Sequence, residues 1–251
     1  MFSAMIKDAH ILKESIDIIS QLIDEGLFKL KRDCIELIAT DRAMVAVVDF
    51  KLVASAFDDY KCDQETAIGL NLLNFLTILK RAGTEDQLTL KLNEKENKLE
   101  IILKGKSTRE FAIPLLDIST EEIPPIGQLD FPADAEVRAD VIAEGIADAD
   151  VIADSVFIEL SENKLRMLAE GDSSRTELKI EKGSESLTKL DAKGTFKSRY
   201  PIDYLKKIIR AGKLVEKVKL QLGTDYPMRL EFIEGAKIKI SFVLAPRVSE
   251  E

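Results

Sequence analysis

The sequence contains few residues of the kinds that form catalytic or metal sites. Its 251 residues include one histidine, His10, and two cysteines, Cys34 and Cys62. A Ser-His-Asp or Cys-His arrangement needs a histidine with partners, and no P-loop, dinucleotide-binding glycine motif or H-E-x-x-H motif occurs. The paired carboxylates Asp58-Asp59 and Glu121-Glu122 are adjacent, so they do not face each other in a helix or strand. We therefore expect no enzymatic activity, no cofactor, no metal and two reduced thiols.

The residues that could bind a charged partner are basic. The segment 202–211 has an apolar stripe with cations on the opposite side, and the segment 72–82 ends in two further cations. The five cations are Lys80, Arg81, Lys206, Lys207 and Arg210. Cations near a helix C-terminus also complement the helix dipole, at about 0.3–1 kcal/mol each. Because both segments carry them, we favour basic faces that bind phosphate over the dipole explanation.

The net charge of −9 argues against nucleic-acid binding unless the charges are segregated. At physiological salt the Debye length is about 8 Å, so a distant acidic surface hardly affects a local basic one. The segment 134–149 is acidic, with Asp140, Glu144 and Asp148 spaced four residues apart on one helical face. That face would repel phosphate and could instead contact a basic surface of another subunit.

The chain resembles itself at an offset of about 130 residues, which indicates two copies of one domain. Residues 75–83 match residues 204–212, and both copies continue into alternating apolar strands at 88–92 and 218–222. The order and spacing of matching segments persist through each half. The alternative is two unrelated α+β halves whose strands happen to match.

The periodicity predicts two helices among many strands in each half. Helices are expected near 9–23, 72–82, 134–149 and 202–211, and Gly83 is the expected C-cap of the second. In the first helix an apolar stripe contains Leu12, Ile16, Ile19 and Ile23, and the other side carries His10, Lys13, Glu14 and Asp17. Alternating, sequential strands predict antiparallel sheets with helices packed on one side, an α+β fold. Residues 116–132 contain several prolines and read as an ordered connector. We expect neither a transmembrane helix nor a signal peptide, and therefore an intracellular protein.

Four segments in the right order carry a resemblance to a known family. They are 22–28 (LIDEGLF), 39–49 (ATDRAMVAVVD), 78–83 (ILKRAG) and 242–248 (FVLAPRV). With the repeat and the connector, the whole chain resembles archaeal and eukaryotic proliferating cell nuclear antigen, nearer the archaeal members. The resemblance implies two topologically similar domains, 1–116 and 134–251, joined by a connecting loop at 117–133. It also implies a homotrimeric, pseudo-sixfold ring with helices inside and sheets outside.

The resemblance further implies a DNA sliding clamp, a processivity factor that encircles duplex DNA in the cytoplasm of an archaeon. Its implied partners are double-stranded DNA, DNA polymerase, a clamp loader, flap endonuclease and ligase, with no membrane. The protein partners would dock short motifs with a Gln and two aromatics. The chain departs from many relatives at Thr40 and Val243, where a larger apolar or aromatic residue is usual.

Three groups of site residues follow from the resemblance. The residues expected to face DNA are Lys7, Lys13, Lys80, Arg81, Lys206, Lys207 and Arg210. The expected pocket for partner peptides consists of Thr40, Met44, Val47, Ile123, Pro124, Pro227, Val243, Ala245 and Pro246. Subunits are expected to pair strands 107–113 and 174–180, with contacts from Arg81, Arg109, Phe111, Glu144, Asp148 and Leu178. Arg81 is therefore expected either at DNA or at the interface.

Two alternatives to a homotrimeric clamp stay open. The chain could be one subunit of a heterotrimeric clamp, which would not form a trimer by itself. It could also be a two-domain enzyme, or a polymerase-accessory protein that does not encircle DNA. The missing catalytic constellation argues against the enzyme.

Overall fold

A computed structural model describes residues 1–119 and 124–247 of the chain. These residues form two compact units. Unit 1 consists of residues 1–42, 48–119 and 234–240, and unit 2 of residues 43–47, 124–233 and 241–247. No helix in the part of the chain that the structure describes is long and apolar enough to cross a membrane.

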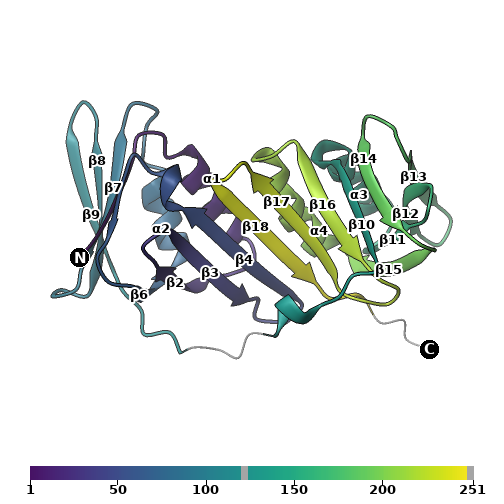
Figure 1. The fold of residues 1–251 in the computed structure, drawn as a ribbon, viewed down its shortest axis with the longest axis horizontal. Helices are drawn as coiled ribbons and strands as arrows, with labels where there is room; N and C mark the ends of the chain where they lie inside the picture. Colours follow the sequence, from purple (N-terminus) through teal and green to yellow (C-terminus); the bar gives the residue numbers. More distant parts are fainter. Residues whose placement is uncertain (120–123, 248–251) are drawn as a thin grey trace. The chain divides into compact units, whose positions relative to one another are not determined.

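Strands dominate both halves of the chain (Figure 1). The helices of the first half are α1 (His10–Ile19) and α2 (Leu72–Leu79), with a 3-10 turn η1 (Ala54–Ala56). Its strands are β1 (Phe2–Ile6), β2 (Glu25–Leu30), β3 (Cys34–Thr40), β4 (Ala46–Val53), β5 (Asp59–Cys62), β6 (Thr66–Asn71), β7 (Gln87–Asn93), β8 (Lys98–Lys104) and β9 (Thr108–Pro114).

The second half has helices α3 (Ala139–Ile152) and α4 (Ile202–Ile208), with 3-10 turns η2 (Ile126–Gln128) and η3 (Ile209–Lys213). Its strands are β10 (Ala133–Arg138), β11 (Ser155–Leu160), β12 (Lys164–Glu170), β13 (Arg175–Glu181), β14 (Leu187–Ala192), β15 (Phe196–Pro201), β16 (Lys217–Leu222), β17 (Met228–Glu234) and β18 (Ile238–Leu244).

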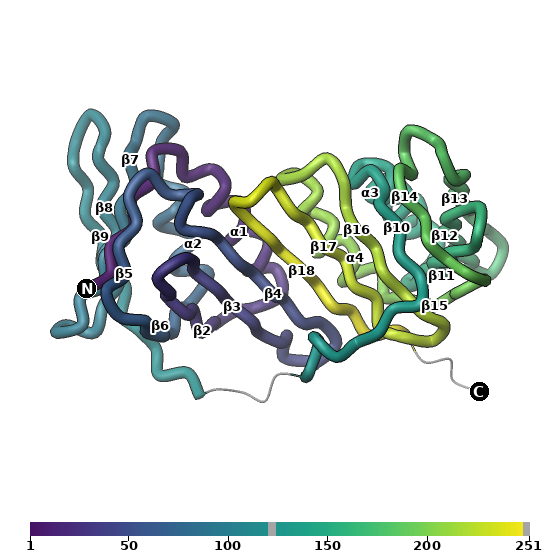
Figure 2. Tube along the Cα trace, in the orientation of Figure 1, coloured from purple at the N-terminus to yellow at the C-terminus, as the bar shows by residue number. Residues whose placement is uncertain are grey.

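The two halves repeat one topology, so the duplication is confirmed and the reading as unrelated halves is wrong. Within the described residues, each half runs strand, helix, five strands, helix, three strands. The strand order β5-β1-β7-β8-β9 recurs as β14-β10-β16-β17-β18, and β6-β2-β3-β4 recurs as β15-β11-β12-β13. The paired strands are antiparallel, as the alternating pattern predicts. The trace in Figure 2 shows β7, β8 and β9 as successive hairpins.

Burial explains why these segments form these elements. In α1 the stripe of Leu12, Ile16 and Ile19 is buried, as its helical spacing predicts. In β8 every second residue is buried, because successive side chains of a strand point to opposite faces. Each such large apolar side chain contributes about 1.5–3 kcal/mol on burial. The helices of each half lie side by side, α1 with α2 and α3 with α4 (Figure 1).

The helix expected over 134–149 is partly wrong, because its first turn is a strand. β10 pairs with β14 and β16, and its residues alternate between buried and half-buried. Ala and Glu favour helices in isolation, but burial of one face between two strands overrides this weak preference. The helix itself begins at Ala139 and continues to Ile152, beyond the predicted end.

The other helix ends also differ from expectation. α1 ends at Ile19 and continues as turns up to Leu22, and the Ile23 N–H donates to the Ile19 carbonyl at 3.0 Å. α2 ends at Leu79, so Gly83 is not its C-cap. The Gly83 N–H instead donates to Asp86 Oδ2 at 2.8 Å. α4 ends at Ile208, and the remaining predicted residues form the 3-10 turn η3.

Candidate functional site

In unit 1 the predicted DNA-facing cations lie on or next to the packed helices α1 and α2. Lys7, just before α1, is exposed and pairs with Asp58 at 3.3 Å. Lys13 is half-buried on α1, while Lys80 and Arg81 follow the last residue of α2 and are exposed. The structure therefore places Lys13 on α1 and Lys80 and Arg81 just after its neighbour α2, an arrangement that sequence spacing alone could not show.

In unit 2 the corresponding cations lie on α4 and η3. Lys206 is exposed, and its Nζ lies 2.7 Å from Asp150 Oδ2 on α3. The hydrogen bond to Asp150 raises the pKa of Lys206, so its ammonium is held in the charged form. Lys207 lies 5.6 Å from the centre of the Tyr204 ring, a cation–π contact. Arg210 is half-buried in η3.

Sequence reasoning missed the carboxylates that partner these lysines. Asp17 was expected on the polar side of α1, but it is a buried residue, and its Oδ1 lies 2.7 Å from Lys80 Nζ. Asp150 lies near the end of α3 and pairs with Lys206. The partners are 63 and 56 residues apart in sequence, so no local spacing links them.

Most of the predicted peptide pocket lies in unit 2. Met44 is 71% exposed and has a positive φ of 57°, so an apolar side chain projects from a turn into solvent. The neighbouring backbone is tied to the C-terminal segment, because the Ala245 N–H donates to the Val45 carbonyl at 2.9 Å. Pro227 is half-buried and Pro124 is exposed. Met44 therefore offers an exposed apolar side chain next to a backbone segment that is hydrogen-bonded to the C-terminal residues.

The other predicted pocket residues have different surroundings. Val47 and Val243 are buried, so both contribute to the core. Ala245 and Pro246 are half-buried at the end of the described chain. Thr40 is half-buried in unit 1, and Ile123 lies outside the described residues.

The two strands expected at subunit contacts are both edge strands. β9 ends the order β5-β1-β7-β8-β9, and β13 ends the order β13-β12-β11-β15. Edge strands present unpaired backbone donors and acceptors, which suits pairing with another chain. Phe111 on β9 and Leu178 on β13 are half-buried. Leu178 packs against α3, since a Cβ added to Gly145 would lie 2.7 Å from its Cδ2.

The charged residues expected at the same contacts are unevenly placed. Glu144 and Asp148 are exposed on α3. Arg109 is engaged within unit 1, because its guanidinium donates to Asp86 Oδ2 and to the Arg81 carbonyl. The sequence carries no signal for this bond, because Asp86 lies in a loop with no periodicity.

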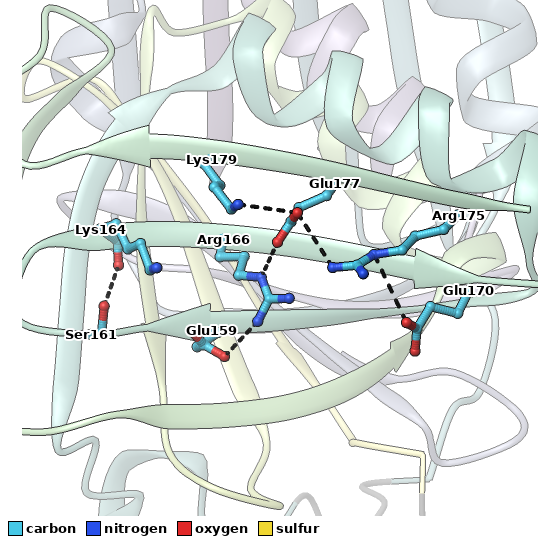
Figure 3. Close-up of polar contacts among 8 residues, drawn as sticks. All are labelled: Glu159, Ser161, Lys164, Arg166, Glu170, Arg175, Glu177 and Lys179. Atoms are coloured by element: carbon cyan, nitrogen blue, oxygen red, sulfur yellow. Dashed lines mark hydrogen bonds and ion pairs between the residues drawn. The ribbon is translucent and has the colours of Figure 1, made fainter.

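A network of ion pairs covers one face of β11, β12 and β13 (Figure 3). Arg166 on β12 contacts Glu159 on β11 at 3.4 Å and Glu177 on β13. The Glu177 carboxylate also forms ion pairs with Lys179 at 3.1 Å and with Arg175 at 3.4 Å. Hydrogen bonds from Lys179 and then Arg166 lower the pKa of Glu177. The network links the edge strand β13 to two strands behind it.

The two cysteines lie in the described part of the chain, and neither forms a disulfide. Cys34 and Cys62 are free thiols. Burial, then hydrogen bonds to Glu36 and Asp33, raise the pKa of Cys34 to about 12, so this thiol stays protonated at neutral pH. Among residues 1–119 and 124–247, no cluster of three or more His, Cys, Asp or Glu could hold a metal ion.

A duplicated antiparallel module, with a helix pair carrying cations in each copy, defines the class of two-domain DNA clamps. The chain belongs to the proliferating cell nuclear antigen family. The model of that family's N-terminal domain matches residues 1–122, and the model of its C-terminal domain matches residues 126–247. The resemblance expected from the sequence is confirmed, and with it the α+β fold of two similar domains.

The relatives match over nearly their full lengths. The chain is 34% identical to a DNA polymerase sliding clamp of Pyrococcus abyssi over 249 residues, 99% of each chain. It is also 34% identical to DNA polymerase sliding clamp 1 of Thermococcus kodakarensis, covering 95% of this chain and 96% of that one. The crystal structure of PCNA from Thermococcus kodakaraensis superposes with a TM-score of 0.91 at 30% identity, covering 98% of this chain and 100% of that one. Full-length similarity to sliding clamps supports a sliding clamp function, and ring assembly is typical of the family.

Proposed function

We propose that this chain is the subunit of a homotrimeric DNA sliding clamp, which encircles duplex DNA and tethers DNA polymerase to it. The observation that carries the proposal is similarity to archaeal DNA polymerase sliding clamps over 99% of the chain. We also propose that the ring acts in the cytoplasm of an archaeon as a processivity factor without chemistry of its own. Its proposed domains are 1–116 and 134–251, with the connecting loop at 117–133.

The cations on the helices suit a clamp that slides. Lysine and arginine contact phosphate oxygens without reading sequence, so one surface serves any position on the duplex. A closed ring retains DNA topologically, so strong binding is unnecessary for long residence. The proposed DNA-facing set keeps all seven residues: Lys7, Lys13, Lys80, Arg81, Lys206, Lys207 and Arg210. The net charge of −9 then places an excess of acidic residues elsewhere, which limits adventitious binding of DNA.

Edge strands β9 and β13 are the proposed subunit contacts. A strand at the edge of one subunit's sheet could continue the sheet of its neighbour through main-chain hydrogen bonds. Arg81 and Arg109 would then contribute charges near Glu144 and Asp148 of a neighbour, with Phe111 and Leu178 adding apolar area. Exposed ion pairs are worth only about 0–1 kcal/mol each, so strand pairing would supply most of the closure.

The apolar surface around Met44 is the proposed docking site for partner proteins. DNA polymerase, a clamp loader, flap endonuclease and ligase would insert a short motif with a Gln and two aromatics. Met44, Pro124 and Pro227 offer apolar area, and the nearby backbone offers main-chain pairing to an extended peptide. Thr40, Val47, Ile123, Val243, Ala245 and Pro246 complete the proposed set.

Retention on DNA of different topology tests the encircling mechanism. The clamp is incubated with nicked circular DNA and with the same DNA linearised, and bound protein is separated by gel filtration. A ring should stay on the circle and slide off the ends of the linear form. Equal retention on both would exclude encirclement and favour an accessory protein that binds DNA from outside.

Light scattering on the purified chain tests the oligomeric state. A homotrimer should have three times the 28.0 kDa mass of one chain. A monomer or dimer that becomes a trimer only with other subunits would instead identify one member of a heterotrimer.

A further inference from the structure

Among the described residues of each unit, an ion pair joins the two helices, and in both cases the cation is a proposed DNA-facing lysine. In unit 1, Asp17 on α1 accepts from Lys80 at the end of α2, at 2.7 Å. In unit 2, Asp150 on α3 accepts from Lys206 on α4, also at 2.7 Å. By the internal repeat, residue 206 corresponds to residue 77 and not to residue 80. The two units therefore both join their helices by a lysine–aspartate pair, but the two lysines occupy positions that are not equivalent in the repeat.

The two carboxylates are less exposed than the lysines they bind. The Asp17 side chain is 12% exposed, whereas the Lys80 side chain is 55% exposed. The Asp150 side chain is 38% exposed and that of Lys206 is 49% exposed. A lysine has a long flexible stem and three donors, so its ammonium can swing from the carboxylate to a phosphate without moving the helix.

Not every proposed DNA-facing cation is held in this way. Within residues 1–119 and 124–247, Lys13 and Lys207 make no ion pair. The helix pairs thus carry two kinds of lysine, one kind paired with a carboxylate and the other without one. A phosphate approaching Lys80 or Lys206 must displace a carboxylate, while a phosphate approaching Lys207 need not.

We propose that Asp17 and Asp150 are built-in competitors of the DNA phosphates, which weaken the hold of Lys80 and Lys206 on the duplex and so keep the clamp mobile. This inference rests on the proposed function. The carboxylate partly neutralises its lysine, and it supplies an alternative partner each time the lysine leaves one phosphate. The clamp moves along DNA by exchanging lysine contacts among phosphates, and a competitor lowers the cost of every exchange.

Asp150→Asn is the direct test, because Asp150 is partly exposed and the amide keeps its shape. Binding of a short fluorescent duplex to the purified full-length chain is measured by anisotropy over a series of salt concentrations. The variant should bind about twofold to fivefold more tightly, the range expected when one exposed ion pair no longer competes. The slope of log affinity against log salt should steepen towards one further phosphate contact, about 0.9 per lysine.

Lys206→Gln supplies the matched background. If Asp150 acts through Lys206, Asp150→Asn should have no effect in a chain that already carries Lys206→Gln. If Asp150→Asn raised DNA affinity equally in wild type and in Lys206→Gln, Asp150 would act only through overall charge. That result would overturn the proposal. Unchanged affinity and slope in the wild-type background would overturn it as well, leaving the pair as a purely structural link between α3 and α4.

Thermal unfolding and DNA retention separate the remaining explanations. If the ion pair is only a structural link, Asp150→Asn should lower the melting temperature and leave DNA binding unchanged. If Asp150 competes with phosphate, DNA binding should become tighter. Wild-type protein is also tested on nicked circular and linear DNA. Equal retention on both would refute the proposed clamp, whereas preferential retention on the circle with no effect of Asp150→Asn would refute only the inference. Asp17→Asn repeats the test in unit 1 and should give the same direction of change.

Discussion

Arg109 donates a hydrogen bond from Nη2 to Asp86 Oδ2 within its own unit. Its Nη1 also donates to the Arg81 carbonyl at 3.1 Å, and the side chain is 34% exposed. Asp86 is itself tied to the Gly83 N–H at 2.8 Å. The arginine proposed for the subunit contact therefore also holds the loop between α2 and β7. Experiments on Arg109 must separate these two roles.

Arg109→Glu should weaken the trimer and also destabilise unit 1. The new carboxylate would face Asp86, and the charge offered to a neighbouring subunit would be reversed. Light scattering at low protein concentration should show a mass below three times 28.0 kDa. Combining Arg109→Glu with Glu144→Arg should restore the trimer, if these side chains meet across the interface.

Asp86→Asn is the control for the local role of Arg109. It should lower the melting temperature and leave the trimer mass unchanged, because the arginine keeps its charge. A full trimer in Arg109→Glu would remove this arginine from the proposed interface.

Glu177 should stabilise the fold only above a threshold in pH. Hydrogen bonds from Lys179 and Arg166 lower its pKa below the ordinary 4.5. A carboxylate whose pKa is lower in the folded state stabilises the fold fully when the pH is above its unfolded-state pKa. This stabilisation is lost as the pH falls through the folded-state pKa. The difference in free energy of unfolding between wild type and Glu177→Gln should therefore be largest above about pH 5 and shrink below 4.5.

Chemical denaturation across this pH range checks the prediction for Glu177. Glu162→Gln serves as the matched variant, since Glu162 is exposed and has no ion pair among the described residues. It should show little difference from wild type at any pH. A Glu177→Gln difference that stays constant from pH 7 to pH 3 would contradict the ion-pair explanation.

Gly69→Ala should destabilise unit 1 at the point where the connector begins. A Cβ at Gly69 would lie 2.3 Å from the Leu116 carbonyl oxygen, a backbone atom that cannot turn away like a side chain. The Leu116 N–H also donates to the Gly69 carbonyl at 2.9 Å. Overpacking of this kind costs about 1–3 kcal/mol in the free energy of unfolding.

Denaturant unfolding and limited proteolysis test the role of Gly69. The variant should unfold at lower denaturant and be cleaved faster after Leu116. Gly127→Ala in the connector should be neutral, because nothing lies within 4 Å of its added Cβ. Equal stability of Gly69→Ala and wild type would show that the connector tolerates displacement.

Met44→Ala should weaken binding of a peptide with a Gln and two aromatics while leaving stability almost unchanged. The side chain is 71% exposed, so its removal opens no cavity in the core. Loss of this apolar contact should cost about 1–2 kcal/mol of binding free energy, measured by calorimetry. Ile233→Ala, another exposed aliphatic in unit 2, should bind the peptide like wild type. An equal loss of peptide affinity in Met44→Ala and Ile233→Ala would show that the peptide does not dock specifically at Met44.

The outline of this protein could be predicted from sequence because its signals are local. Helical and alternating apolar periods identified α2, α4 and the strands β7 and β16, since burial of one face imposes its period on the residues. The matching segments 75–83 and 204–212 disclosed the duplication, because two copies of one module keep the same order of periods. The same residues carried the resemblance to the clamp family.

The errors arose where a weak local preference met a strong tertiary environment. Residues 134–138 have good helix formers, but β14 and β16 pair with both edges of that segment and make it a strand. Asp17 was expected on the polar side of α1 and is instead buried. In both cases neighbours distant in sequence decided the outcome.

The sequence alone determined the repeat, the family and the types of charge on the helices, because these depend on residue identity and short spacing. Only the tertiary structure decided which charges meet. Lys80 with Asp17, Lys206 with Asp150 and Arg109 with Asp86 are joined by packing of elements 63, 56 and 23 residues apart. An ion pair depends on separation in space, and the chain sets that separation only once its helices and sheets have packed.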